Sequence, residues 1–143
     1  MKIHNRPQLI ALDVDDTLFT EKLYYTGEDL GSEKTLRRLV AEGHKLMLFT
    51  RREDKDLIDV LRWFKFKNIP LVAINSAPFD YLDDRNIRKP PFDILIDDKA
   101  LGAPMRKTVD DRWVINWTKV EEMLEELGIL NPTYNENMQS RGM

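Results

Sequence analysis

Five short apolar runs, separated by polar segments, set the hydrophobic pattern of this chain. They lie within residues 9–12, 45–50, 71–75, 92–98 and 112–117. Runs of a few residues rich in leucine, isoleucine and valine are typical of buried strands. The pattern therefore predicts five strands.

Apolar residues at helical spacing fill three of the intervals around these strands. A first helix is expected after Ser32 as N-cap, with Gly43 where it ends. A second is expected over about Lys55 to Lys65, and a third after Thr118, whose spacing from Glu121 matches a capping box. Strands that alternate with helices favour an α/β fold. We expect a doubly wound (Rossmann-like), mainly parallel five-stranded sheet with helices on both faces.

Length and composition narrow the class of protein. The 143 residues fit a single domain over residues 1–130, followed by a polar tail over 131–143. Hydrophobic residues make up 42% of the chain, and no run approaches the roughly 20 residues that span a bilayer. The first residues lack the apolar core of a signal peptide, and a cytoplasmic location is expected. The absence of cysteine excludes disulfides and thiolate metal sites. A net charge of −3 argues against a general polyanion-binding protein.

Acidic residues follow two of the predicted strands. Asp13 and Asp15 come directly after the first, and Asp97 and Asp98 end the fourth. In parallel α/β sheets ligands bind at the carboxyl ends of the strands. Two carboxylates about 4 Å apart repel by about 4 kcal/mol at an effective dielectric of 20, and folding alone gives no reason to accept that cost. A bound divalent cation or a shared proton would compensate for that repulsion.

Two further strand-end residues complete a phosphate site. Thr50 ends the second predicted strand, and Lys89 stands just before the fourth. A hydroxyl and an ammonium can hold phosphate oxygens, while Mg²⁺ held by carboxylates offsets the remaining negative charge. No cysteine and only two histidines are present, so nothing indicates zinc.

The order of these residues resembles that of the haloacid dehalogenase superfamily of phosphatases. The first motif of that family, DxDx(T/V), is matched by Asp13, Asp15 and Thr17. Thr50 matches its second motif, Lys89 its third and the Asp97-Asp98 pair its fourth. The resemblance runs from about Leu9 to Asp98. Within the superfamily, the chain is similar to the small capless members and to the phosphatase halves of polynucleotide kinases.

The resemblance implies a role for each matching residue. Asp13 would attack phosphorus and form an aspartyl-phosphate, and Asp15 would act as general acid and then as general base. Thr50 and Lys89 would hold the phosphoryl group. Mg²⁺ would be bound by Asp13, by Asp15 through its carbonyl and by the Asp97-Asp98 pair. Which acid of that pair binds the metal directly, and which only lies beside it, stays open. The implied activity is Mg²⁺-dependent hydrolysis of phosphomonoesters.

Neighbouring residues leave several readings open. Arg51 and Arg52 either grip a second anionic group of the substrate or are solvated, and Asp16 is either a site residue or a loop residue. Tyr24 and Tyr25 lie in a short flap or hairpin over residues 19–31. The aromatic residues Trp113, Trp117 and Phe64 are assigned to packing.

The resemblance also bears on the substrate. The intervals between motifs are too short for the ~50 residues of a separate cap domain, so the expected site is open. An open site admits a phosphorylated small molecule or a phosphorylated polymer end. Basic clusters around residues 65–67 and 85–88 leave a nucleic-acid partner open without indicating one. A homo-oligomer that covers the site with a neighbouring subunit is also open, and no membrane partner is expected.

Two alternatives to an enzyme are retained. One is a catalytically silent module of the same fold that binds phosphorylated ligands. The other is a receiver-type phospho-acceptor domain, which uses similar residues around Mg²⁺. Receivers place the acidic pair first and the lysine last, whereas here the DxD motif comes first and the acidic pair follows the lysine. The order of the motifs therefore disfavours the receiver.

Overall fold

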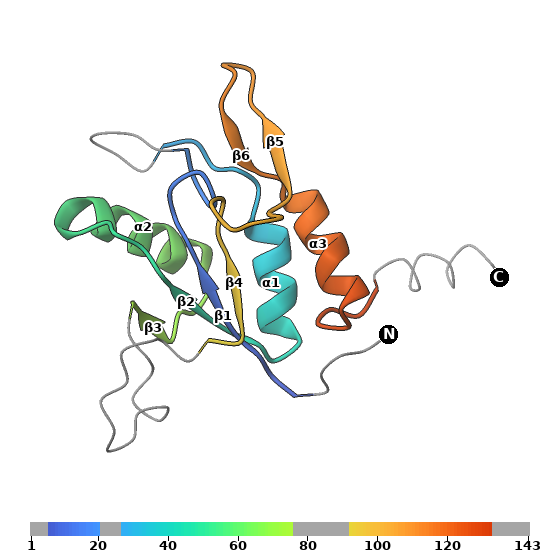
Figure 1. Cartoon of the computed structure of the whole chain (residues 1–143). Coiled ribbons are helices and arrows are strands. Elements are labelled where there is room, and N and C mark those ends of the chain that lie inside the picture. Colours follow the sequence, from blue (N-terminus) through green and yellow to red (C-terminus); the bar gives the residue numbers. More distant parts are fainter. Residues whose placement is uncertain (1–5, 21–26, 76–91, 133–143) are drawn as a thin grey trace.

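A computed structural model describes residues 6–20, 27–75 and 92–132 of the chain. The strands within these residues are β1 (Leu9–Leu12), β2 (Lys45–Leu48), β3 (Ala73–Ile74), β4 (Ile94–Ile96), β5 (Met105–Lys107) and β6 (Trp113–Ile115). The helices are α1 (Glu33–Ala41), α2 (Asp54–Lys67) and α3 (Trp117–Glu126). Figure 1 shows α1 and α3 side by side against the sheet and the β5–β6 hairpin projecting from the body of the protein.

The main sheet is parallel and has four strands, in the order β3-β2-β1-β4. This confirms the expected α/β class. Among the described residues, no fifth strand joins this sheet. The residues predicted for it do form a strand, β6, but β6 pairs antiparallel with β5 in a separate two-stranded sheet. The reason is local, because a hairpin turn returns the chain directly onto the preceding strand, where antiparallel pairing needs no crossover.

Strand β1 lies in the middle of the sheet and is fully buried on both faces. Its four residues are all apolar, as expected for a central parallel strand. Ile10 and Leu12 face a core to which α1, α2 and α3 all contribute. Leu9 and Ala11 face the opposite side, in a smaller cluster with Met47. Within the described residues, then, all three helices cover one face, whereas the sequence predicted helices on both.

The order of the strands creates a crevice beside β1. From β1 the chain passes through α1 to β2 and through α2 to β3, moving outward on one side. Strand β4 lies on the other side of β1, so the direction of winding reverses between these two strands. A reversal of this kind leaves an opening at the carboxyl ends of the two strands, where ligands of open α/β sheets bind. Asp13 and Asp97 stand at that opening.

The helix ends agree with the sequence in two cases and differ in a third. Helix α1 starts directly after Ser32, and Gly43 follows its end with a φ of 93°, which glycine adopts without strain. Helix α3 begins earlier than expected. Its N-cap is Asn116, whose side chain accepts a hydrogen bond from the Lys119 amide, so the predicted capping box at Thr118 was wrong.

The predicted flap is described only at its two ends. Phe19 forms an antiparallel bridge with Asp29, and the Thr20 amide donates to the carbonyl of Glu28. These contacts agree with a hairpin. Tyr24 and Tyr25 lie outside the described residues.

None of the helices in the described part of the chain is long and apolar enough to cross a membrane.

Candidate active site

A cleft of about 450 Å³ opens at the carboxyl ends of β1, β2, β3 and β4. Five carboxylates line it: Asp13, Asp15, Asp16, Asp97 and Asp98. Thr50, Arg51, Asn75 and Lys99 are the other polar residues of the lining, and Phe49 is its apolar residue. The cleft is therefore strongly acidic at one end and contains hydroxyl, amide and cationic groups around it.

The main chain places Asp13 and Asp97 at neighbouring strand ends. The Asp13 amide donates to the Ile96 carbonyl at 3.0 Å, which extends the pairing of β1 with β4 by one residue. Asp97 follows Ile96 directly, and Asp98 comes next. One carboxylate oxygen from each of the three aspartates lies within 4.8 Å of the other two. We call Asp13, Asp97 and Asp98 the acidic triad.

The hydroxyl of Thr17 links two members of the triad. It accepts a hydrogen bond from the Asp98 amide at 3.0 Å. As a donor, Thr17 Oγ1 lies 3.1 Å from Asp13 Oδ2 and 3.2 Å from Asp98 Oδ1. The hydroxyl has one proton, so it donates to only one of these two oxygens at a time. The other carboxyl group then lies close by without a hydrogen bond from the Thr17 proton.

The surroundings of Asp13 and Asp98 raise the pKa of both carboxyl groups. Burial raises the pKa of Asp13 to about 8, and a side-chain hydrogen bond with Asp98 and the charge of Asp97 act in the same direction. Burial also raises the pKa of Asp98. Without a cation, Asp13 therefore holds a proton at neutral pH. Oxygen-only donors around an uncompensated negative charge are what Mg²⁺ prefers, so the residues present fit that ion.

Asp15 lies in the same cleft with a different partner. Its Oδ1 accepts hydrogen bonds from Arg52 Nε at 2.9 Å and from Arg52 Nη2 at 2.5 Å. The side chain of Asp15 does not belong to the triad that could hold a metal ion. The two aspartates of the DxD motif therefore sit in distinct surroundings, one among carboxylates and one against a guanidinium.

Thr50 stands across the cleft, at the end of β2. Its amide donates to Asn75 Oδ1 at 2.7 Å, and its Oγ1 accepts from the Arg52 amide at 3.1 Å. Asn75 follows β3 and has a φ of 62°, a left-handed conformation that asparagine tolerates better than most residues. The turn at Asn75 thus fixes the position of the Thr50 backbone.

Contacts from the C-terminal part of the chain support the loop after β1. Arg112 donates from Nε and Nη2 to the two oxygens of Asp16 at 2.7 and 2.9 Å. The buried indole of Trp117 donates to the Thr17 carbonyl at 2.7 Å. Asp16 has a φ of 60°, so the chain turns sharply between the two motif residues on either side of it. The structure thus gives Asp16 an anchoring role.

Most of the residues predicted for the site are brought together. Asp13, Asp15, Thr50, Arg51, Asp97 and Asp98 all line the cleft. Lys89 lies outside the described residues, so its role stays a prediction, as does metal binding by the Asp15 carbonyl. Arg52, predicted to bind substrate, is buried against Asp15.

Sequence reasoning missed Asn75 and the supporting contact of Trp117. Asn75 carried a usable signal, because it is a polar residue at the end of a predicted strand, like Thr50. The Trp117 contact carried none, since a hydrogen bond to a carbonyl 100 residues earlier leaves no mark on local pattern.

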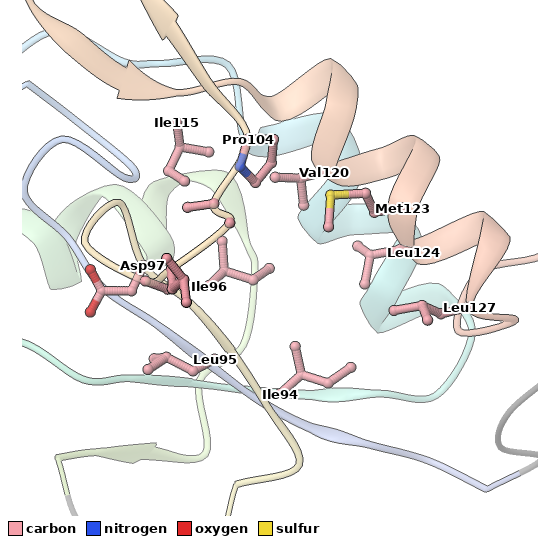
Figure 2. Close-up of a pocket in the computed structure, with 14 residues that line it drawn as sticks. Ile94, Leu95, Ile96, Asp97, Pro104, Ile115, Val120, Met123, Leu124 and Leu127 are labelled. Atoms are coloured by element: carbon pink, nitrogen blue, oxygen red, sulfur yellow. The ribbon is translucent and has the colours of Figure 1, made fainter.

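A second pocket, of about 180 Å³, lies between β4 and α3 and is lined almost entirely by apolar side chains. Ile94, Ile96, Val120 and Leu124 are among them. Figure 2 shows the Asp97 carboxylate turned away from these side chains. The pocket offers no group for phosphate or metal chemistry beyond that residue.

Comparison with known proteins supports the fold. No family model and no curated protein sequence matches this chain. A solved structure of a conserved protein from Bacteroides thetaiotaomicron is similar to it, with 26% sequence identity and a TM-score of 0.65. The match covers 85% of this chain and 92% of that protein. That protein is described as conserved, with no activity stated, so the chemistry must be argued from the cleft itself.

Proposed function

We propose that this chain is a metal-dependent phosphomonoester hydrolase that works through an aspartyl-phosphate on Asp13. The observation that carries the proposal is the convergence of Asp13, Asp97 and Asp98 at the crevice between β1 and β4, with Asp15 beside them and Thr50 opposite. The proposal includes a Rossmann-like, doubly wound arrangement, for which the parallel sheet and its reversal beside β1 provide support.

Mg²⁺ is the proposed cofactor, held by Asp13, Asp97 and Asp98 together with the Asp15 carbonyl. The reason lies in the acidity of the site. A nucleophilic carboxylate must be ionised, and the surroundings raise the pKa of Asp13 to about 8. A divalent cation bound there would favour the carboxylate form of Asp13 and offset the charge of the phosphoryl group.

The proposed reaction has two steps. In the first, an Asp13 oxygen attacks phosphorus, the bond to the leaving oxygen breaks, and that oxygen takes its electron pair and a proton from Asp15. In the second, Asp15 removes a proton from water, whose oxygen attacks phosphorus. The bond between the Asp13 oxygen and phosphorus breaks, its electron pair restores Asp13 as a carboxylate, and inorganic phosphate leaves.

The groups opposite the triad suit the transferring phosphoryl group. Thr50 offers a hydroxyl close to its turn with Asn75, and Arg51 offers an exposed guanidinium. Lys89, which lies outside the described residues, is the proposed ammonium donor. Substrates of the proposed enzyme are phosphorylated small molecules or phosphorylated polymer ends, because the cleft has room for a group larger than phosphate alone.

Phosphate release tests the proposal. The panel contains sugar phosphates, nucleotides, phosphopeptides and oligonucleotides phosphorylated at either end, each with Mg²⁺ and with EDTA. We expect release that requires the metal and is lost in Asp13→Asn. Absence of release from every substrate would contradict the proposal and favour a module that only binds phosphorylated ligands.

A further inference from the structure

Two adjacent arginines after β2 differ sharply in their surroundings. Arg51 is exposed and lines the cleft. The side chain of Arg52 is only 6% exposed and points its guanidinium at Asp15. Burying a guanidinium is costly unless it is paired, so its position reflects a specific partner rather than chance.

The contact between Arg52 and Asp15 is selective for one oxygen. Both Nε and Nη2 of Arg52 donate to Oδ1 of Asp15, at 2.9 and 2.5 Å. A carboxylate oxygen has two lone pairs, and two N–H groups occupy both. A proton on this carboxyl therefore resides on the other oxygen, Oδ2.

Arg52 is itself held in place by the second strand end. Its amide donates to Thr50 Oγ1 at 3.1 Å, and the Thr50 amide is fixed by Asn75. Arg52 Nη1 also lies 3.5 Å from the Asp56 carbonyl in α2. A chain of contacts thus connects Asp15 to the residue proposed to hold phosphate.

We propose that Arg52 is a positioning residue for general acid–base catalysis. It fixes the Asp15 carboxyl so that Oδ2 alone gives the proton to the leaving oxygen and later takes one from water. This inference rests on the proposed phosphatase activity. It assigns Arg52 a role through Asp15 in place of a contact with substrate.

The two roles predict different dependence on the leaving group. p-Nitrophenolate leaves without a proton, whereas an alkoxide must be protonated as the bond breaks. Removing a positioning residue should therefore lower kcat/KM far more for alkyl phosphates than for p-nitrophenyl phosphate. Removing a phosphate-binding residue should lower kcat/KM equally for both substrates, because both carry the same phosphoryl group.

The test compares Arg52→Gln, Arg52→Lys and wild type with glycerol phosphate and p-nitrophenyl phosphate. The quantity measured is kcat/KM, which reports the steps up to transfer to Asp13 and is insensitive to the later hydrolysis. For Arg52→Gln we expect a loss of about 10²–10³-fold with glycerol phosphate and less than about 10-fold with p-nitrophenyl phosphate. Arg52→Lys should be intermediate, since lysine keeps the charge and lacks the rigid pair of donors.

Controls separate this effect from misfolding. Arg62→Gln removes an arginine from the exposed surface of α2 and should change neither substrate. Circular dichroism and the rise in melting temperature with Mg²⁺ should match wild type in both Arg52 variants, because the acidic triad is intact. Arg52→Lys provides the folded variant for the comparison if Arg52→Gln is unstable.

The possible outcomes distinguish a failure of the positioning role of Arg52 from a failure of the proposed phosphatase activity. No turnover by wild type of these two substrates or of any in the panel above would contradict the proposed phosphatase. Turnover by wild type with equal losses on both substrates in the Arg52 variants would overturn the positioning role and leave the phosphatase standing. Unchanged kcat/KM in Arg52→Gln would overturn it as well.

Discussion

The acidic cleft and the apolar pocket meet at Asp97 and follow opposite physical rules. The cleft gathers carboxylates, and burial raises the pKa of Asp13 and Asp98, so ionising them in the folded protein carries a free-energy cost. The pocket gathers leucine, isoleucine and valine side chains from β4 and α3, whose burial stabilises the fold. The contrast indicates where function lies, because the close carboxylates of the cleft need a bound cation or a proton to compensate their repulsion, whereas the apolar pocket needs neither.

The largest effect we expect comes from the cleft. Asp13→Asn should lower kcat by about 10⁴-fold or more, because the amide cannot form the aspartyl-phosphate. It should not lower the melting temperature of the metal-free protein, because the uncharged amide replaces a carboxyl group that is itself protonated at neutral pH without a cation. Steady-state kinetics and thermal unfolding check both parts. Activity within tenfold of wild type would remove Asp13 as nucleophile.

The pocket should behave in the opposite way. Leu124→Ala removes a side chain that is 3% exposed, and should lower the free energy of unfolding by about 2–5 kcal/mol. At temperatures where the variant is folded, kcat should stay close to wild type. Met123→Ala is the matched control, since Met123 lines the same pocket but is 43% exposed and should cost far less. A large loss of kcat in folded Leu124→Ala would break the separation between the two regions.

Metal binding should stabilise the protein through the cleft. At a Mg²⁺ concentration of 100 times Kd, wild type should gain about 2.7 kcal/mol in free energy of unfolding, and EDTA should reverse the gain. Asp97→Asn should weaken the gain, whereas Leu124→Ala should retain it on a lower baseline. An equal Mg²⁺ gain in Asp97→Asn would argue against the acidic triad as the metal site.

The smallest expected effect is a pH dependence of the metal-free protein. The pKa of Asp13 is raised from 3.8 to about 8 on folding, so between these values the folded state binds more protons than the unfolded state. Stability from this group is full below pH 3.8 and is lost as pH rises through about 8. Denaturation in urea at pH 5 and pH 8 should show wild type losing on the order of 2 kcal/mol relative to Asp13→Asn, after allowance for solvent screening. Parallel pH curves for the two proteins would contradict this.

Much of the fold follows from local pattern, and its exception is instructive. Short apolar runs located β1, β2, β3 and β4, because a buried parallel strand needs apolar residues on both faces. The run at 112–117 also forms a strand, yet its partner is Met105–Lys107, which includes two cationic residues and carries no apolar pattern. Strand pairing is a tertiary property, so the sequence predicted the strand and not the sheet to which it belongs.

The site was predictable where the backbone alone decides it. Parallel strands bring their carboxyl ends together, so the convergence of Asp13 with Asp97 could be read from their places in the chain. The difference between Arg51 and Arg52 could not, because neighbouring residues of one type have the same local signal and only tertiary packing decides which is buried. The sequence predicted a packing role for Trp113, yet this residue is 58% exposed. Here too, only tertiary packing decides whether the side chain is buried.

The most direct test of the central claim is to trap the phosphoryl group on the protein. Asp15→Asn, given p-nitrophenyl phosphate and Mg²⁺, should release one burst of p-nitrophenol per enzyme molecule, because formation of the intermediate then needs no acid while its hydrolysis lacks a base. Acid quenching and peptide mapping should place the phosphoryl group on Asp13. Turnover with no phosphoryl group on Asp13, or with the group on another residue, would contradict the account.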